Sequence, residues 1–127
     1  MFRIAKDFTF AAGHWIVGHP GECARPHGHN YRVRVTLAAR ELDEIGMVLD
    51  FADLKRLVGE ILAPFDHRML NDVEPFDAVA TTAERLAEHV FGEAAAKVHE
   101  LAGERVAVER VEVWENETSM ASYEGDR

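Results

Sequence analysis

The chain has very little cysteine and no long apolar run. Its 127 residues include one cysteine, Cys23. A single thiol cannot form an internal disulfide, so we expect a free thiol in a reducing compartment. A membrane-spanning helix needs about 18 or more consecutive apolar residues, and a secretory leader needs a shorter apolar core near the N-terminus; neither pattern occurs. These absences predict a cytoplasmic protein with no membrane partner.

Basic residues are also scarce. Fourteen Lys and Arg face 23 Asp and Glu, giving a formal net charge of −9. Such a balance argues against nucleic acid as a partner, and an anionic substrate would need a local basic pocket. A chain of this length buries about two-thirds of its unfolded surface in one core, so a single domain spanning residues 1–127 is expected.

Histidine, in contrast, is concentrated in one short stretch. Four of the seven histidines lie between residues 14 and 29. His27 and His29 are two residues apart, so on an extended strand both side chains share one face and can reach one ion. Neutral imidazole suits Zn²⁺, and a catalytic zinc has three protein ligands and an open position, which makes His14 the natural third ligand. Unrelated surface histidines are the alternative, and the clustering favours a metal site.

Cys23 lies in the same stretch and has two possible roles. The surrounding sequence GHPGECARPHGH is polar and offers no apolar periodicity that would bury the thiol. As a thiolate near a metal, Cys23 is a candidate base for removing a proton beside a carbonyl. The other possibility is a fourth zinc ligand, which would close the coordination shell and make the site structural.

Two further groups of residues are candidates for chemistry. In Asp66-His67 a carboxylate can orient an imidazole and stabilise its protonated form, and in a turn both can face Cys23; a surface Asp-His pair is an equal alternative. Near the C-terminus, a buried carboxylate at Glu115 can accept two hydrogen bonds from the amidine-like edge of a pterin or guanine. Glu112 and Glu117 compete with Glu115 for this role.

Hydrophobic periodicity predicts the order strand, strand, helix, helix, strand, strand. Residues 2–14 alternate as a strand, and 27–40 show the clearest period of two. Asp50 is a good N-cap for a helix ending near Pro64, and residues 65–72 are expected to be irregular. Thr81-Thr82-Ala83-Glu84 fits a capping box before a helix that Gly103 closes. In 105–123 the parity of the valines slips, which indicates a bulge or a strand covered on both faces.

This order favours an α+β fold, a four-stranded antiparallel sheet with two helices on one face. The edges of so small a sheet invite pairing between subunits, so a homo-oligomer is expected.

Six blocks of the sequence, in the same order, resemble the 6-pyruvoyl-tetrahydropterin synthase and 6-carboxy-tetrahydropterin synthase family. The blocks are FTFAAGH, CARPHGH, VLDFADLK, FDHRMLND, TTAERLA and the segment from Glu115 to Tyr123. The resemblance implies the tunnelling fold, whose sheets close into a barrel on oligomerisation, here as a trimer or hexamer with sites between subunits. It also implies that His14, His27 and His29 are zinc ligands. Cys23, Asp66 and His67 would form a catalytic triad, and Glu115 would anchor the pterin.

The resemblance also implies a substrate, 7,8-dihydroneopterin triphosphate. One branch of the family eliminates triphosphate and gives the 6-pyruvoyl product; the other also releases acetaldehyde and gives 6-carboxy-5,6,7,8-tetrahydropterin on the route to queuosine. The CARPHGH block and the short length favour the carboxy-forming branch, while TTAE resembles the pyruvoyl branch. Arg25 and Thr82 are assigned as further substrate contacts. A noncatalytic pterin- or zinc-binding relative is the alternative from another class.

Overall fold

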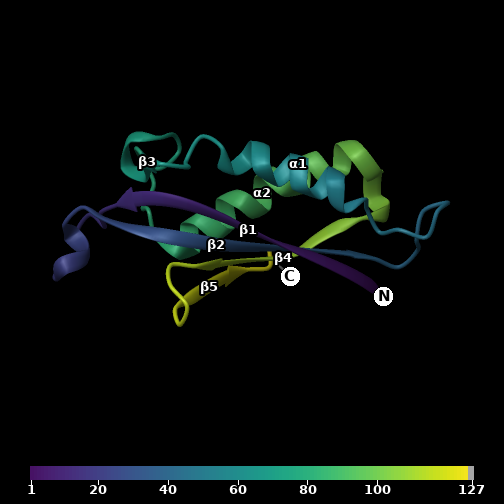
Figure 1. Ribbon diagram of the computed structural model, residues 1–127, viewed down its shortest axis with the longest axis horizontal. Helices are drawn as coiled ribbons and strands as arrows, with labels where there is room; N and C mark the ends of the chain where they lie inside the picture. Colours follow the sequence, from purple (N-terminus) through teal and green to yellow (C-terminus); the bar gives the residue numbers. More distant parts are fainter. Residues whose placement is uncertain (126–127) are drawn as a thin grey trace.

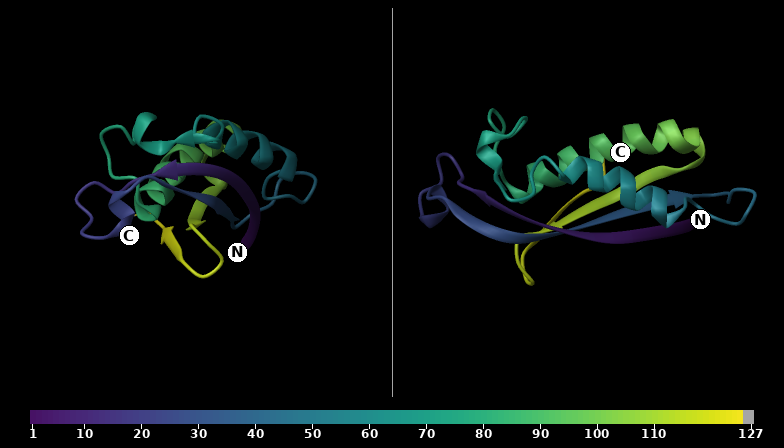
Figure 2. Two further views of the ribbon diagram at one scale, coloured as in Figure 1. Left: turned by 60° about the vertical axis from the view of Figure 1, so that its left-hand side comes forward. Right: turned by 45° about the horizontal axis from the view of Figure 1, so that its top comes forward.

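The computed structural model describes residues 1–125, which form one layer of helices on one face of a twisted sheet (Figures 1 and 2). The sheet has the strand order β3-β1-β2-β4-β5. Its strands are β1 (Phe2–His14), β2 (His27–Ala39), β3 (Arg68–Met69), β4 (Ala107–Trp114) and β5 (Met120–Tyr123), and the helices are α1 (Phe51–Leu62) and α2 (Ala83–Ala102). The expected α+β architecture is therefore confirmed.

The sheet contains one strand more than the four predicted. The polar segment 65–72, expected to be irregular, includes the two-residue β3, which pairs parallel to β1 through Ala12↔Arg68 and Gly13↔Met69. So short a strand leaves no periodic pattern in the sequence, because it is held by its neighbour and not by a buried face of its own. The other three strand pairings are antiparallel, as expected.

The long hairpin of β1 and β2 forms the spine of the molecule (Figure 1). It is antiparallel over 13 residue pairs, from Phe2↔Ala39 to His14↔His27. Alternate side chains of β2 turn towards the helices and are almost fully buried, as the period of two predicted; they are Tyr31, Val33, Val35 and Leu37. Because the histidines share the parity of these residues, they lie at the end of the same buried face.

The slip in valine parity in β4 is a bulge. Thr36 of β2 pairs with Arg110 and Leu37 pairs with Val108, so Glu109 is an extra residue on β4. Val108 and Val111 are consequently both buried against the helices although they differ in parity. Of the two explanations left open by the sequence, the bulge is the one the structure shows.

The two helices begin at side-chain caps. The Asp50 carboxylate accepts a hydrogen bond from the backbone N–H of Ala52 at 2.8 Å, as predicted for the start of α1. The capping box predicted for α2 is wrong in its register: Thr82 is the N-cap, and its hydroxyl accepts from the N–H of Arg85 at 3.2 Å. Two successive threonines both suit an N-cap, so the sequence could not decide between them. The helix ends where expected, at Gly103 with φ +61°.

The opposite face of the sheet carries paired charges. Arg34 donates to the Asp7 carboxylate at 2.7 and 3.0 Å, and the guanidinium of Arg32 lies 3.8 Å from the centre of the Trp114 ring. The sheet does not close on itself, because β3 and β5 remain its edges. Over residues 1–125, neither helix combines the length and apolar character that crossing a membrane requires.

Candidate metal centre and active site

The hairpin register brings three histidines together at one end of the sheet. His14 is the last residue of β1 and lies opposite His27, and His29 follows two residues later on the same face of β2. The ligand atoms of the three imidazoles all lie within 4.8 Å of one another, and Nε2 of His14 is 3.1 Å from Nε2 of His29. His14 is fully buried, whereas the other two are half-buried.

Backbone carbonyls fix the ring orientation of two of these histidines. Nδ1 of His14 donates to the carbonyl oxygen of Thr81 at 2.8 Å, and Nδ1 of His27 donates to that of Arg25 at the same distance. With the proton held on Nδ1, each ring presents the lone pair of Nε2 to its neighbours. A ligand histidine that donates its other nitrogen to a carbonyl is the usual arrangement around zinc.

Burial also favours the neutral form of two of these histidines, His14 and His29. Burial lowers the pKa of His14 below its usual value, and burial likewise lowers the pKa of His29. Both rings are thereby kept neutral near pH 7, and only the neutral imidazole can donate a lone pair. Three imidazole nitrogens gathered at one end of the sheet fit a divalent transition metal such as zinc.

Cys23 lies outside this group. It is on the short 3-10 turn Glu22–Ala24, half-buried, and its carbonyl accepts a hydrogen bond from the N–H of Ile16 at 2.7 Å, which folds the loop back on itself. Among residues 1–125 the potential metal-ligand group contains the three histidines without the cysteine. The geometry of the single chain therefore does not support Cys23 as a fourth ligand that closes the site.

Asp66 and His67 pair with each other. Asp66 Oδ1 lies 2.9 Å from Nδ1 of His67 and also accepts from the N–H of Ala11 at 3.0 Å. The N–H of His67 donates to the carbonyl of Ala11 at 2.6 Å. These bonds hold His67 at φ +60°, a conformation that non-glycine residues seldom adopt and that is concentrated at functional sites.

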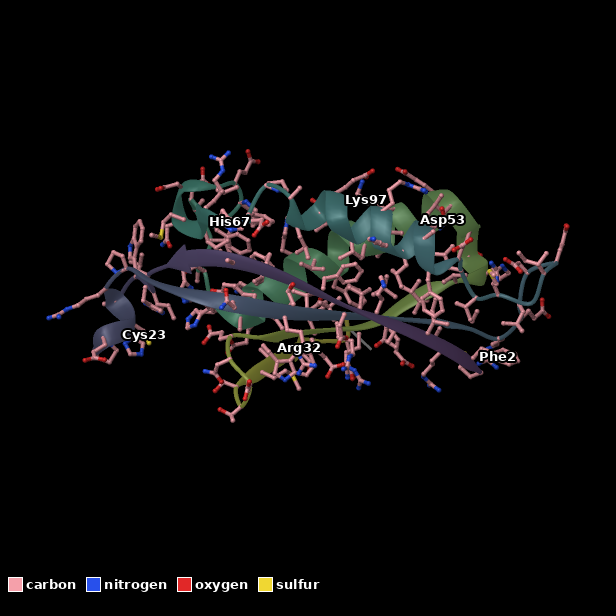
Figure 3. All side chains as sticks on the ribbon, in the orientation of Figure 1. Phe2, Cys23, Arg32, Asp53, His67 and Lys97 are labelled. Carbon is pink, nitrogen blue, oxygen red and sulfur yellow. The ribbon has the colours of Figure 1, made fainter. Side chains whose placement is uncertain are left out.

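This pair does not meet Cys23 within one chain. The His67 side chain is 81% exposed, and Figure 3 shows His67 above β1 and Cys23 at the tip of the loop beyond the hairpin, well apart. The expected joint orientation of Asp66 and His67 towards the thiol is therefore not formed here. His67 instead lines a cavity of about 460 Å³ together with His29.

Glu115 is placed beside the histidines from the other side. It follows β4, with its N–H bonded to the carbonyl of Ser119 at 3.1 Å, and it lines a cavity of about 670 Å³ together with His29 and Trp114. Its charge opposes the fall in the pKa of both His14 and His29.

The two competing glutamates are placed differently. Glu112 pairs across the sheet with Ser122, and its carboxylate lies 3.5 Å from Nε of Arg110 on the charged face. Glu117 lines the same cavity as Glu115 but is exposed. The position of Glu115 therefore suits the expected role best.

The two remaining candidates have backbone or capping roles in the single chain. Arg25 is exposed and supplies the carbonyl that orients His27, while the Thr82 hydroxyl caps α2. Sequence reasoning missed Thr81 and Asn71, which bond the residues around His14. A small polar residue in a loop carries no periodic signal, so these contacts could be found only from the fold.

Taken together, the fold and the site define an α+β protein with a group of three histidines that could hold a metal ion, beside two cavities. Comparison with known proteins gives the family. The sequence model of 6-pyruvoyl tetrahydropterin synthase matches residues 3–126, and the chain belongs to that family.

Individual relatives agree with this assignment. The chain is 38% identical to the 6-carboxy-5,6,7,8-tetrahydropterin synthase of Synechocystis over 128 residues, covering 97% of this chain and 93% of the relative. It is 33% identical to the Haemophilus influenzae protein of the same name over 141 residues, covering 98% and 99%. Among solved structures, the 6-pyruvoyl tetrahydropterin synthase of Caenorhabditis elegans superposes with a TM-score of 0.82 at 28% identity, covering 98% of this chain and 96% of that chain.

Replacing one histidine should abolish metal binding without unfolding the chain. We expect His27→Ala to lose stoichiometric zinc, because two imidazoles retain the ion poorly against a competing chelator. Cys23→Ala is the matched control from the same loop and should keep its zinc. Metal analysis after dialysis against a chelator measures both, and full zinc in His27→Ala would contradict the assigned ligands.

Proposed function

We propose that this protein is a zinc-dependent 6-carboxy-5,6,7,8-tetrahydropterin synthase. It converts 7,8-dihydroneopterin triphosphate and one water molecule into 6-carboxy-5,6,7,8-tetrahydropterin, acetaldehyde and triphosphate. The observation that carries the proposal is the three-histidine group, two of whose rings are oriented by backbone carbonyls, beside the cavity that His29 lines together with Glu115. The choice of branch rests on relatives of that name at 33–38% identity over nearly the whole chain.

His14, His27 and His29 would hold the zinc. A zinc ion bound there supplies Lewis acidity that favours loss of a proton from carbon beside a substrate oxygen. The donors present suit this ion, because three imidazole ligands leave a coordination position free for substrate or water.

The proton transfers are assigned to Cys23 and to the pair Asp66 and His67. Because Nδ1 of His67 faces the Asp66 carboxylate, its Nε2 is the atom free to give or take a proton. The Cys23 thiolate is assigned as the base that acts on the substrate side chain.

Substrate recognition is assigned to the second cavity. The Glu115 carboxylate can accept two hydrogen bonds from the N–H and amino group of the pterin, and it is close enough to the histidines to hold the ring beside them. Arg25 remains our candidate for the triphosphate, and Thr82 a candidate contact near the start of α2.

We propose that the complete site forms between subunits of a homo-oligomer. Within one chain the thiol of Cys23 and the imidazole of His67 lie apart, and His67 is largely exposed (Figure 3). The sheet has free edges at β3 and β5, which a second subunit can pair with or cover. Assembly as a trimer or hexamer would bring the cysteine of one subunit to the Asp66–His67 pair of another.

Weighing the pterin product tests the reaction. We expect the zinc-loaded protein to give a pterin that keeps one side-chain carbon as a carboxylate, with acetaldehyde carrying the other two. Mass spectrometry of the pterin and trapping of the aldehyde measure both products. A pterin that keeps all three carbons would establish the 6-pyruvoyl reaction of the structural relative instead. Zinc and pterin binding without any product would establish a noncatalytic relative.

Mixing two inactive variants tests the shared site. Cys23→Ala and His67→Ala should each be inactive, and subunit exchange between them should restore activity because some interfaces then combine an intact thiol with an intact imidazole. An equal mixture is expected to recover roughly a quarter of wild-type activity for random pairing in a closed symmetric assembly. Light scattering verifies the assembly. Mixed oligomers without recovered activity would contradict the interfacial site.

Replacing Glu115 should weaken substrate binding specifically. Glu115→Gln leaves a pterin donor unpaired in a desolvated pocket, and each hydrogen bond to a charged group is worth about 1.5–3 kcal/mol, so binding should weaken roughly ten- to a hundredfold. Zinc content should not change. Glu117→Gln, from the same cavity, is the matched control in a titration with substrate. A loss in Glu117→Gln alone would assign the anchor to Glu117.

A further inference from the structure

A cluster of hydrogen bonds holds the backbone just after the metal ligand His14. The N–H of Trp15 donates to Oδ1 of Asn71 at 3.0 Å, and Nδ2 of Asn71 donates to the carbonyl of Trp15 at 2.9 Å. The Thr81 hydroxyl donates to that same carbonyl at 2.9 Å. The carbonyl of Thr81 in turn accepts from Nδ1 of His14. We call Asn71 and Thr81, with these four bonds, the Trp15 clamp.

The clamp extends the sheet beyond its last regular pair. β1 ends at His14, and its ladder with β3 includes only Ala12 and Gly13. The amide of Asn71 supplies one donor and one acceptor to Trp15, as a neighbouring strand would, so a side chain replaces the next rung. Directly after Trp15 the chain enters the loop that carries Cys23, and β3 does not continue beside this loop.

The clamp acts on His14 in two ways. The bond from the Trp15 N–H fixes the peptide unit that follows His14, and the bonds to the Trp15 carbonyl fix the next one. Together they set the direction of the Cα–Cβ bond of His14. The Thr81 hydroxyl bonds the Trp15 carbonyl and so holds the Thr81 backbone in place. The Thr81 carbonyl then fixes the rotation and tautomer of the His14 imidazole. Thr81 is only 2% exposed, so solvent cannot replace its hydroxyl at this site.

The clamp also joins the metal ligand to the Asp66–His67 segment. Asn71 lies on the turn Leu70–Asp72 that follows β3. One end of this segment is bonded to Ala11 through Asp66 and His67, and the other is bonded to Trp15 through Asn71. His14 therefore lies on a stretch of β1 that is held at both ends by the same segment.

We infer that Asn71 and Thr81 are positioning residues for the metal centre, which set the orientation of His14 by clamping Trp15. The inference rests on the proposed function, because it assumes that the three histidines hold zinc. The hydrogen bonds described for these two residues go to His14 and Trp15, and not to the ligands His27 and His29. Their contribution is to make His14 ready to bind before the ion arrives.

Isosteric replacement of the buried hydroxyl tests the inference. Thr81→Val keeps the shape and the carbonyl but removes the bond to Trp15, whereas Thr81→Ser keeps the bond. We expect Thr81→Val to bind zinc about 10- to 100-fold more weakly, as for loss of other groups that orient ligands, and Thr81→Ser to restore the affinity. Chelator competition measures zinc affinity, and the visible absorption of the cobalt-substituted protein reports ligand geometry.

Thr36→Val is the matched control. Thr36 is a buried threonine on β2, the strand that carries His27 and His29, but it lies opposite Ala5 far along the hairpin. It should leave the affinity and the cobalt spectrum unchanged. Asn71→Ala, which removes the half-buried side of the clamp, should reproduce the effect of Thr81→Val and serves in its place if that variant does not fold.

The outcomes separate this inference from the proposed function. Wild-type protein that binds neither zinc nor cobalt would overturn both. If the wild-type protein binds zinc, and Thr81→Val and Asn71→Ala show the same zinc affinity and cobalt spectrum as the wild type, the positioning role alone is overturned. Lower thermal stability of the metal-free variants with unchanged zinc affinity would show a structural role only, and would likewise overturn it.

Discussion

The register between β1 and β2 is the constraint on which the rest of the site depends. Thirteen antiparallel pairs place His14 opposite His27, and the strong alternation of buried residues on β2 prevents any other alignment. A slip by one residue would move His27 and His29 to the charged face and leave Val33 and Val35 in water. The hydrophobic core thus fixes the metal centre: the same burial that stabilises the sheet decides which side chains meet at its end.

Much of this arrangement could be predicted from the sequence, because it follows from periodicity. The period of two in β2, the helix caps at Asp50 and Gly103 and the slip in β4 all have signals within a few residues. The histidine group could be predicted for the same reason, since HGH is local and His14 ends the neighbouring strand.

What the sequence could not give depends on contacts between distant segments. β3 forms because it pairs with Ala12 and Gly13 of β1. The Trp15 clamp joins Trp15 to Asn71, 56 positions away, and to Thr81, 66 positions away. The separation of Cys23 from His67 within one chain also has no local signal, because motif spacing does not show which segments meet in the fold. The joint orientation of Asp66 and His67 towards the thiol, expected from the residues themselves, is not formed within the single chain.

The bulge at Glu109 determines which side chain faces the metal centre. With Glu109 as the extra residue, the odd positions Val111 and Val113 turn inward, and continuing the alternation brings Glu115 to the same side as the histidines. In a strand of unbroken parity from Val108, the inward side chain at this level would be that of Trp114 and the carboxylate would join the arginines outside. One inserted residue, six positions away, therefore decides whether a carboxylate or an indole ring lies on the side of the histidines.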